Sequence, residues 1–414
     1  MLIKSALIID SRSPHNGTVK DILITDGYIQ TISDNITSQH DEIINAKGKC
    51  ISAGWFDMKV NFRDPGEEFK EDLITGCEAA AAGGFTGVAL MPSTVPPLQS
   101  KSQIEYVINK TKNNTVNVYP VGALTVNREG KELCELYDMK RAGAIAFTDD
   151  KRTVHDSGVL LRALIYSENI DSLIITFAED KNLAMQGEVN ESAATTMLGF
   201  KGVPTLAEEL IVARDIQLSE YADVPVHISC VSSARSVQLI REAKKKGLKI
   251  TCDVAAYSLL SDDGDLKTFN SNFKVKPPLR SKADVEALRE GIVDNTIDVI
   301  VSDHSPQHFE SKEVEFDYAT FGMIGLETFF GVVMSSMQNR MELSALIEKF
   351  TTRPRAILNL PVYHIKEGEP ADLTIFDTTS QWTFTKNDIH SKSTNTPYIG
   401  ITFKGKAEQV ISFG

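Results

Sequence analysis

The sequence predicts an α/β fold: a TIM (β/α)8 barrel with a small β-sandwich domain built from both termini. Short β-branched runs alternate with longer segments of helical period between residues 55 and 305. The alternation repeats eight times, which is the number of units that closes such a barrel. Both ends of the chain instead show short strands and turn signals with little helical period.

Eight apolar runs are predicted as the strands of the barrel, and a helical segment follows them. Residues 233–246 illustrate a helix, because Val237, Ile240 and Ala243 fall on one face and Gly247 can end it after a basic last turn. The predicted strands are residues 56–62, 87–92, 116–124, 144–148, 173–178, 224–230, 248–254 and 297–303.

The two terminal segments are predicted to pair with each other. Turn signals at residues 25–28, 45–48 and 403–406 separate short strands there. Two β segments separated by a barrel most simply form one small sandwich beside it. We therefore expect a sandwich domain from residues 1–52 plus 364–414 and a barrel from 53–363.

Composition and charge exclude several classes of protein. The chain has 414 residues, 42% hydrophobic and 24% charged, with a formal net charge of −13 and no Lys/Arg-rich run. We therefore expect no nucleic-acid partner. The apolar N-terminus is interrupted by Lys4 and closed by Asp10, and no segment approaches the roughly 18 apolar residues of a membrane helix. We expect a cytoplasmic protein with no membrane partner.

The cysteines argue against two kinds of structural site. There are five, an odd number, and no two of them form a C-x-x-C pair. This pattern is typical neither of a disulfide framework nor of a thiolate zinc site.

A TIM barrel has its reactive groups at the carboxyl ends of its strands. The residues at these ends of the predicted strands resemble those of a known family. Residues 57–66, DMKVNFRDPG, resemble the strand-one signature D-x-H-V-H-x-R-D-P-G of bacterial dihydroorotases, with both histidines replaced. Further stretches match in the same order: GGFTG (83–87), MPSTVPP (91–97), AFTDD (146–150), FAED (177–180), KVKPPLR (274–280), SDHSP (302–306), GMIGLET (322–328), GEPADLT (368–374) and NTPYIG (395–400). The chain thus resembles the bacterial class I dihydroorotases of the amidohydrolase superfamily over nearly its whole length.

The resemblance implies a metal site that this chain has altered. The family uses one or two zinc ions to activate a water and polarise a cyclic amide, with an aspartate as general base. The family's ligand positions hold Lys59, Asn61, Asp150 (or its neighbour Asp149), Phe177, Cys230 and Asp303. All four histidines are replaced, mostly by groups that cannot bind zinc or bind it poorly. We therefore expect no metal or other cofactor, with Asp303 retained at the general-base position.

The substrate contacts that the resemblance implies are altered in parallel. Arg63 stands where the family pairs an arginine with the substrate carboxylate. Ser93 and Lys276 replace two asparagines, Gln307 replaces a histidine, and residues 256–258 replace a P-H-H segment.

Two replaced positions allow a structural and a chemical interpretation. Lys59 can form a buried ion pair with Asp150 and Asp303, or act as a base or Schiff-base amine. Cys230 can be an inert core thiol or a nucleophile. We favour the structural interpretation of both.

Three histidines lie near the altered site in the sequence. His227 is predicted on the opposite side of its strand from Cys230, packed against a helix. His304 is expected to point out of the barrel. His308, in the loop beyond, is expected in solvent, although it could reach the mouth.

Three functions remain open. We favour an inactive dihydroorotase-like protein of pyrimidine biosynthesis that is a structural or regulatory partner, most simply of aspartate transcarbamoylase, and that forms a homo-oligomer. The alternative is an active dihydroorotase or related cyclic-amide hydrolase, interconverting carbamoyl aspartate and dihydroorotate at an atypical zinc site, or a metal-free hydrolase using Lys59, Cys230 and Asp303. The third is a ligand-sensing module in which Arg63 anchors a carboxylated small molecule.

Overall fold

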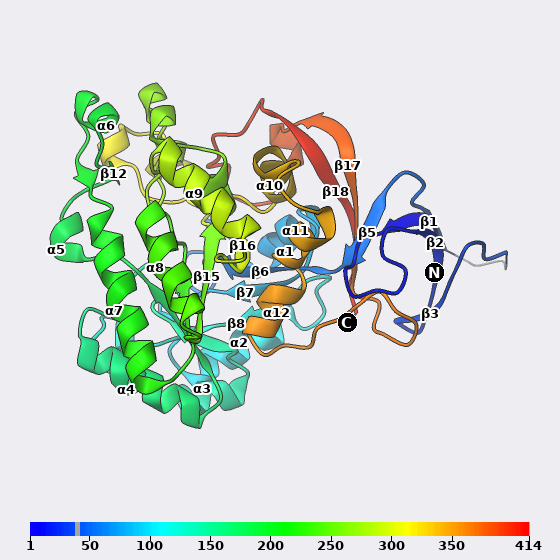
Figure 1. Ribbon diagram of the computed structural model, residues 1–414, viewed down its shortest axis with the longest axis horizontal. Helices are drawn as coiled ribbons and strands as arrows, with labels where there is room; N and C mark the ends of the chain where they lie inside the picture. The colour runs from blue at the N-terminus through cyan, green and yellow to red at the C-terminus, as the bar shows by residue number, and fades with distance from the viewer. Residues whose placement is uncertain (38–41, 414) are drawn as a thin grey trace.

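The computed structural model describes residues 1–37 and 42–413, so small parts of both predicted terminal segments lie outside it. Figure 1 shows a large body of helices around a central sheet and, beside it, a β domain in which strands from the two ends of the chain lie together. This arrangement confirms the predicted fold class, a barrel with a β domain from both termini.

Each of the eight predicted runs overlaps an observed barrel strand. Neighbouring strands pair in parallel, and the ring closes where Asn61 N donates to His304 O at 2.9 Å. The third run is split at Val121 into two strands. The barrel strands are β6 (Trp55–Val60), β7 (Phe85–Leu90), β8 (Asn117–Pro120) with β9 (Gly122–Ala123), β10 (Ala146–Thr148), β11 (Leu173–Phe177), β14 (Val226–Ser229), β15 (Ile250–Ala255) and β16 (Val299–Val301).

Helices follow the strands and cover the outside of the barrel (Figure 1). The predicted helix after the sixth strand is confirmed: Ser233 caps its start, and Gly247, with φ 79°, follows its end. The covering helices are α1 (Leu73–Ala82), α2 (Lys101–Thr111), α3 (Leu136–Ala142), α4 (Ser157–Asn169), α7 (Leu206–Ala222), α8 (Ala234–Lys245), α9 (Lys282–Val293) and α10 (Phe329–Met337).

Shorter elements fill the loops. An excursion after β11 contains α5 (Lys181–Ala184), β12 (Val189–Asn190), α6 (Ala193–Met197) and β13 (Gly202–Val203), and α11 (Leu343–Glu348) and α12 (Thr352–Ile357) follow the barrel. Short 3₁₀ helices are η1 (Val126–Arg128), η2 (Ala256–Leu259), η3 (Asp263–Thr268), η4 (Ser271–Phe273), η5 (Phe309–Ser311), η6 (Phe316–Tyr318) and η7 (Lys386–Asp388).

The β domain joins the two ends of the chain in one sheet. Its strands are β1 (Leu2–Ile8), β2 (Val19–Thr25), β3 (Tyr28–Ser33), β4 (Ile43–Asn45), β5 (Cys50–Ala53), β17 (Leu373–Thr383) and β18 (Thr402–Ile411). They run in the order β18-β17-β5-β1-β2-β3, with β4 beside β1, and the antiparallel pair β5–β17 connects the termini as predicted. Hydrogen bonding thus links all seven strands in a single sheet.

One turn prediction in this domain is wrong. Residues 403–406 lie inside β18 instead of between two strands. Gly405 has φ 86°, and the pairing of β18 with β17 changes register at this point. A glycine in a strand can therefore mark a bulge as well as a turn, and the sequence pattern does not distinguish them.

Two cores hold the molecule together. The barrel core includes Trp55, whose ring packs against four phenylalanines, Phe85, Phe330, Phe350 and Phe376. A second core lies in the β domain and includes Ile51 and Ile375. Because neighbouring side chains on a strand point to opposite faces, Ile375 and Phe376 let β17 serve both cores.

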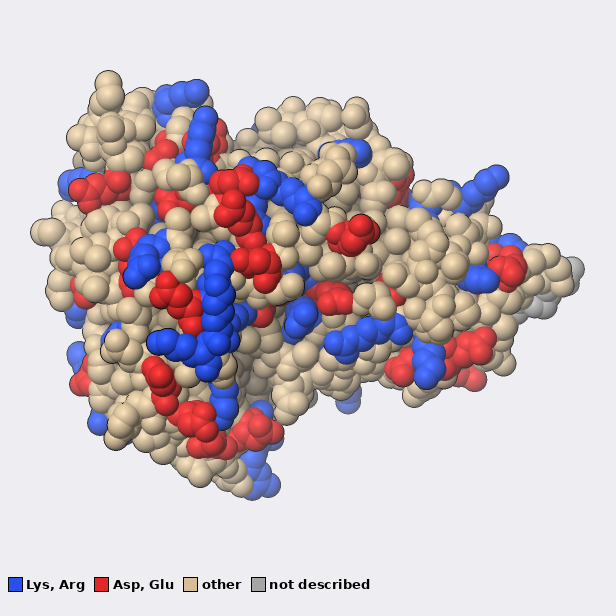
Figure 2. Space-filling model, viewed as in Figure 1, with Lys and Arg blue, Asp and Glu red and all other residues tan. Residues whose placement is uncertain are grey.

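The surface carries mixed charge. On the face in Figure 2, Lys and Arg side chains lie among Asp and Glu side chains over the barrel helices. Among the described residues, no helix has the length and apolar character needed to span a bilayer.

Candidate functional site

All the site positions predicted from the sequence lie at the carboxyl ends of barrel strands or in the loops that follow. Lys59 is in β6 and Phe177 ends β11, whereas the other positions come after their strands. These are Asn61 and Arg63 after β6, Ser93 after β7, Asp150 after β10, Cys230 after β14, Lys276 after β15, and Asp303 and Gln307 after β16. The fold thus brings them to one mouth of the barrel.

Lys59 and Asp150 form a buried ion pair. Lys59 Nζ lies 2.7 Å from Asp150 Oδ1, and the two side chains are 2% and 3% exposed. Burial alone would lower the pKa of Lys59, but the negative charge of Asp150 outweighs it and raises that pKa. Burial would likewise raise the pKa of Asp150, but the charge of Lys59 holds it well below its usual value. Lys59 is therefore a fixed cation, and the interpretation as a neutral amine base loses its basis.

Asp303 is bonded to partners other than Lys59. Its Oδ2 accepts from Lys151 Nζ at 2.6 Å and from the Tyr257 hydroxyl at 2.7 Å. The prediction that Lys59 would pair with both aspartates is thus right for Asp150 and wrong for Asp303. The other oxygen, Asp303 Oδ1, is buried and has no hydrogen-bond partner among the described residues.

The two neighbouring aspartates after β10, Asp149 and Asp150, have different partners. Asp149 Oδ1 accepts from the backbone N–H groups of Leu124 and Thr125, and Oδ2 accepts from the Thr125 hydroxyl. Asp149 therefore ties β10 to the preceding strand. Asp150 is the one that faces the mouth, where it also accepts from the Ser93 hydroxyl.

Two contacting residues, Lys151 and Arg128, were missed in the sequence, and a third, Tyr257, lies in the segment 256–258 that was noted there without a role. Lys151 and Tyr257 hold Asp303, and Arg128 donates through a terminal guanidinium nitrogen to Ser93 Oγ. Lys151 directly follows the Asp149-Asp150 motif and Tyr257 follows the seventh strand, so position was a usable signal for both. Nothing comparable marked Arg128.

The backbone at the mouth is strained at four site positions. Arg63, Asp150, Cys230 and Asp303 all have left-handed φ values, of 60°, 54°, 55° and 52°. For a residue other than glycine each such conformation costs about 1–2 kcal/mol. It persists where surrounding structure holds it, commonly at functional sites. These four positions thus share a specialised backbone, three of them with the residue type that the family resemblance implies and one, Cys230, with a different one.

Gly66, in the loop after Arg63, is expected to tolerate no side chain. Its φ is 101°, and an added Cβ would lie 1.8 Å from Val95 O. Gly66→Ala should therefore lower the free energy of unfolding by more than about 2 kcal/mol, measured by urea denaturation. Gly199→Ala is the matched control, since φ is 83° with nothing within 4 Å of the Cβ, and it should cost only about 1–2 kcal/mol. Equal losses in the two variants would show that the contact with Val95 is unimportant.

Cys230 is an enclosed thiol. It is 3% exposed, and burial together with the charge of Asp303 raises its pKa well above the usual value. A thiol in this state is a poor nucleophile, in agreement with the structural interpretation. Its backbone N–H donates to Asp253 Oδ1 at 2.6 Å.

His227 bonds to a neighbouring strand instead of the predicted helix. Its ring nitrogens lie 2.8 Å from Thr251 Oγ1 and 2.9 Å from Asp253 Oδ2, both on β15. Because Asp253 also holds the Cys230 backbone, this buried pair supports the strained turn at the mouth.

The side chains of Phe177, Lys276 and Gln307 contact other parts of the described chain and do not converge on a common point as metal ligands would. Phe177 is 3% exposed, with Lys276 Nζ 5.8 Å from its ring centroid, and Lys276 pairs with Glu179 at 2.7 Å. Gln307 Nε2 donates to Phe321 O at 2.8 Å. Buried oxygens of Asn61 and Gln307 have no partner in the described part of the chain.

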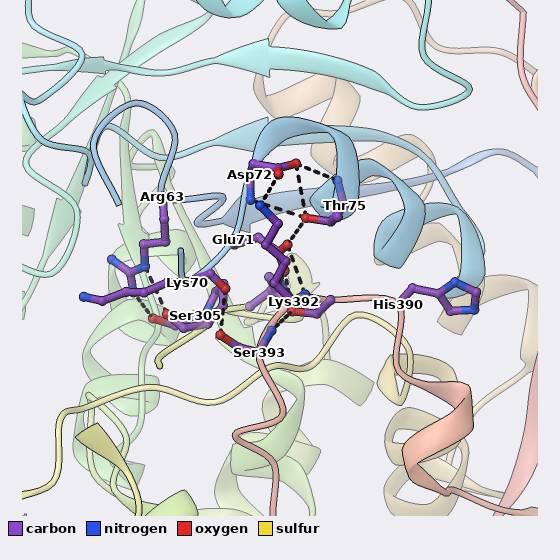
Figure 3. Close-up of polar contacts among 12 residues, drawn as sticks. Arg63, Lys70, Glu71, Asp72, Thr75, Ser305, His390, Lys392 and Ser393 are labelled. Atoms are coloured by element: carbon purple, nitrogen blue, oxygen red, sulfur yellow. Dashed lines mark hydrogen bonds and ion pairs between the residues drawn. The ribbon is translucent and has the colours of Figure 1, made fainter. Parts of the chain in front are cut away.

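A carboxyl-terminal segment, residues 390–395, packs beside the mouth. Figure 3 shows Glu71, Asp72 and Lys70 facing Lys392 and Ser393 of this segment. Glu71 accepts from the Ser391 hydroxyl, and Lys392 Nζ pairs with Asp72. The segment therefore anchors the loop that carries Arg63.

The other two histidines, His304 and His308, contact this loop. His304 is fully buried, with Nε2 3.5 Å from Glu71 Oε2, and its Nδ1 accepts from Gly325 N at 3.2 Å. His308 is 32% exposed and its ring packs near Phe69.

The residues at the mouth do not fit a zinc ion. Zinc needs imidazole, thiolate or carboxylate groups converging at about 2.0–2.3 Å. Within residues 1–37 and 42–413, no three His, Cys, Asp or Glu side chains are grouped so that they could hold a metal ion. An ammonium lies directly against Asp150, and the Cys230 thiol stays protonated.

Comparison with known proteins identifies the family. A family model described as dihydro-orotase-like matches residues 48–236. The dihydroorotase of Acetivibrio thermocellus is 42% identical over 408 residues, covering 98% of this chain and 96% of that protein. The dihydroorotase of Pelotomaculum thermopropionicum is 42% identical over 409 residues, covering 98% and 95%.

Solved structures agree on the fold. The L-hydantoinase (dihydropyrimidinase) of Arthrobacter aurescens superposes with a TM-score of 0.87 at 23% identity, covering 100% of this chain and 94% of that one. The dihydropyrimidinase of Brevibacillus agri gives 0.84 at 21% identity, with the same coverage. The fold agrees with these hydantoinases, and the sequence agrees with the dihydroorotases over almost its full length: the chain belongs to the dihydroorotase family.

Proposed function

We propose that this protein is an inactive dihydroorotase homologue of pyrimidine biosynthesis that acts as a structural or regulatory partner of aspartate transcarbamoylase. The observation that carries the proposal is the buried pair of Lys59 with Asp150. It places a permanent cation beside the carboxylate that the family resemblance assigns to the metal.

The second carboxylate supports the same conclusion. A general base must reach a water and take its proton. Oδ2 of Asp303 is already bonded to Lys151 and Tyr257. A lysine thus lies beside each of the two carboxylates, and its positive charge opposes both metal binding and the activation of water in the family's manner.

One observation favours an active enzyme as the second candidate. Asp303 Oδ1 is free of hydrogen bonds in the described part of the chain, and Arg63 stays at the mouth. An atypical zinc site or a metal-free cyclic-amide hydrolase would use these two groups. Alanine at Asp303 should then abolish the activity.

Metal content and turnover decide between the two candidates. The purified protein should contain zinc far below one ion per chain and should not hydrolyse dihydroorotate or close carbamoyl aspartate. Stoichiometric zinc together with turnover would overturn the proposal of inactivity.

A variant with all four histidines restored is the matched control. Lys59→His, Asn61→His, Phe177→His and Cys230→His together supply imidazoles beside Asp150 and Asp303 and remove the ammonium that competes at Asp150, while Lys151 stays beside Asp303. The variant should gain zinc, measured by elemental analysis and by a zinc-dependent rise in Tm. Failure to gain zinc would contradict the view that these side chains alone determine the loss.

The partnership needs a separate test because it is drawn from the family resemblance alone. The purified protein should form a complex with aspartate transcarbamoylase of the same organism, seen by light scattering after gel filtration. Two separate peaks at micromolar concentrations of both proteins would refute the partnership and leave the question of activity to the metal analysis.

A further inference from the structure

Two guanidinium groups at the barrel mouth lack a carboxylate partner in the described chain. Arg63 donates to Ser305 Oγ at 2.7 Å and to Pro306 O at 3.2 Å, as Figure 3 shows for Ser305. Arg128 donates to Ser93 Oγ, and its buried Nε has no acceptor among the residues described. All of these acceptors are neutral.

The other cations at the mouth are paired with carboxylates. Lys59 pairs with Asp150, Lys151 with Asp303 and Lys276 with Glu179, so these three pairs are neutral. Glu67, whose charge acts on Arg63, forms its own ion pair with Lys70 at 2.5 Å. Within residues 1–37 and 42–413, Arg63 and Arg128 remain without an ion pair of their own.

The two arginines also influence each other. Burial is the largest reason that the pKa of Arg128 is lowered, and the positive charges of Arg152 and Arg63 lower it further. Burial likewise lowers the pKa of Arg63. Two partly buried cations that have no ion-pair partner among the described residues are unfavourable, and an anion held by both would relieve this cost.

Both side chains are held in place before any ligand arrives. Arg63 and Arg128 have left-handed backbones, with φ of 60° and 56°. Ser93, the acceptor of Arg128, donates in turn to Asp150 of the buried ion pair. An anion would therefore bind with little further ordering of the protein.

We propose that the barrel mouth binds a small dianion, either phosphate or a short dicarboxylate, between Arg63 and Arg128 without a metal ion. Guanidinium groups bind the oxygens of both anions through paired, charge-assisted hydrogen bonds. The family resemblance assigns one substrate carboxylate to Arg63, whereas the second anchor, Arg128, comes from this structure. The inference rests on the proposed function in one respect, the absence of zinc from the mouth.

Calorimetric titration of the full chain in the presence of a chelator tests the proposal. The probes are inorganic phosphate, succinate and, as the single-charge match of succinate, propionate, all at one ionic strength set with chloride. At least one dianion should bind roughly tenfold more tightly than propionate and raise Tm, because it engages two guanidinium groups instead of one. Tighter binding of phosphate would indicate that the site accepts a compact dianion, and tighter binding of succinate would indicate an extended one.

Two variants connect the binding to Arg128. Arg128→Gln should weaken dianion binding about tenfold while leaving propionate binding nearly unchanged. Arg241→Gln is the control, since Arg241 on α8 pairs with Asp294 outside the mouth, and it should bind the dianion like the wild type. Circular dichroism verifies that both variants are folded.

Either of two results would overturn the inference: no dianion binds more tightly than propionate, or Arg128→Gln binds the dianion as well as the wild type. Failure of the proposed function has a different signature. It would appear as zinc and turnover in the untreated protein, whereas the chelator removes metal from the titration.

Discussion

Replacing Lys59 with methionine is expected to lower the free energy of unfolding by about 3–5 kcal/mol, because it leaves a buried carboxylate without its partner. Asp150 is 3% exposed, and Lys59 Nζ lies 2.7 Å from it. The hydroxyl of Ser93 would remain as a neutral donor to Asp150. Urea unfolding at neutral pH measures the change.

The loss should shrink as the pH falls. In the wild type the pKa of Asp150 is lowered, so the stability from the pair is present above the unfolded pKa of about 3.9 and is lost as the pH falls below it. Without Lys59, burial raises that pKa, and protonation then relieves the unpaired charge. Lys59→Met should thus be less destabilising at pH 4.5 than at pH 7.

Two further variants separate the ion pair from packing. Lys59→Met with Asp150→Asn removes both charges and should be clearly more stable than Lys59→Met alone. Lys131→Met is the exposed control, because its pair with Glu129 is 79% and 50% exposed, and it should cost at most about 1 kcal/mol. A pH-independent loss in Lys59→Met would contradict the assignment to an unpaired carboxylate.

Arg355→Met is expected to destabilise the protein by a similar amount, about 3–5 kcal/mol. Arg355 on α12 donates to Asp372 at 2.6 Å, and the two side chains are 3% and 2% exposed. Its guanidinium also lies 5.1 Å from the Phe56 ring centroid, which Met can only partly replace. Because Asp372 directly precedes β17, the pair connects the barrel to the β domain.

The effect of Arg355→Met is also measured by urea unfolding. Adding Asp372→Asn should recover part of the loss, since no buried charge then remains unpaired. Arg353→Met, two residues away, is the control because its contact with Glu348 is 3.7 Å long and half exposed. If Arg353→Met and Arg355→Met lower the free energy of unfolding equally, the buried pair of Arg355 with Asp372 is no more stabilising than an exposed one.

The barrel strands could be predicted from the sequence because their signal is local. Each run of apolar, β-branched residues is long enough to distinguish a strand from the helix that follows it. Residues 403–406 show the limit of this reasoning, since Gly405 permits a turn and a bulge equally well, and its pairing partner on β17 decides.

For the candidate site, the sequence could predict which residues lie at the mouth, because they follow the ends of the strands. It could not predict all the pairs that their side chains form. Lys59 beside Asp150 followed from the family motifs and from barrel closure. The pairing of Lys151 and Tyr257 with Asp303 joins residues 152 and 46 positions apart. Such partners depend on side-chain direction in the closed barrel, which no local pattern specifies.

By itself the sequence determined the fold class, the positions at the mouth and which residues stand where the family resemblance places histidines, because residue identity and periodicity are local properties. Only the tertiary structure decided which aspartate faces the mouth and that Asp150 and Asp303 each have a lysine partner. It also decided that Arg63 and Arg128 bond to neutral acceptors and to no carboxylate in the described part of the chain. These are properties of charges brought together in a buried space, where distance and desolvation determine which groups stay ionised and which can accept a ligand.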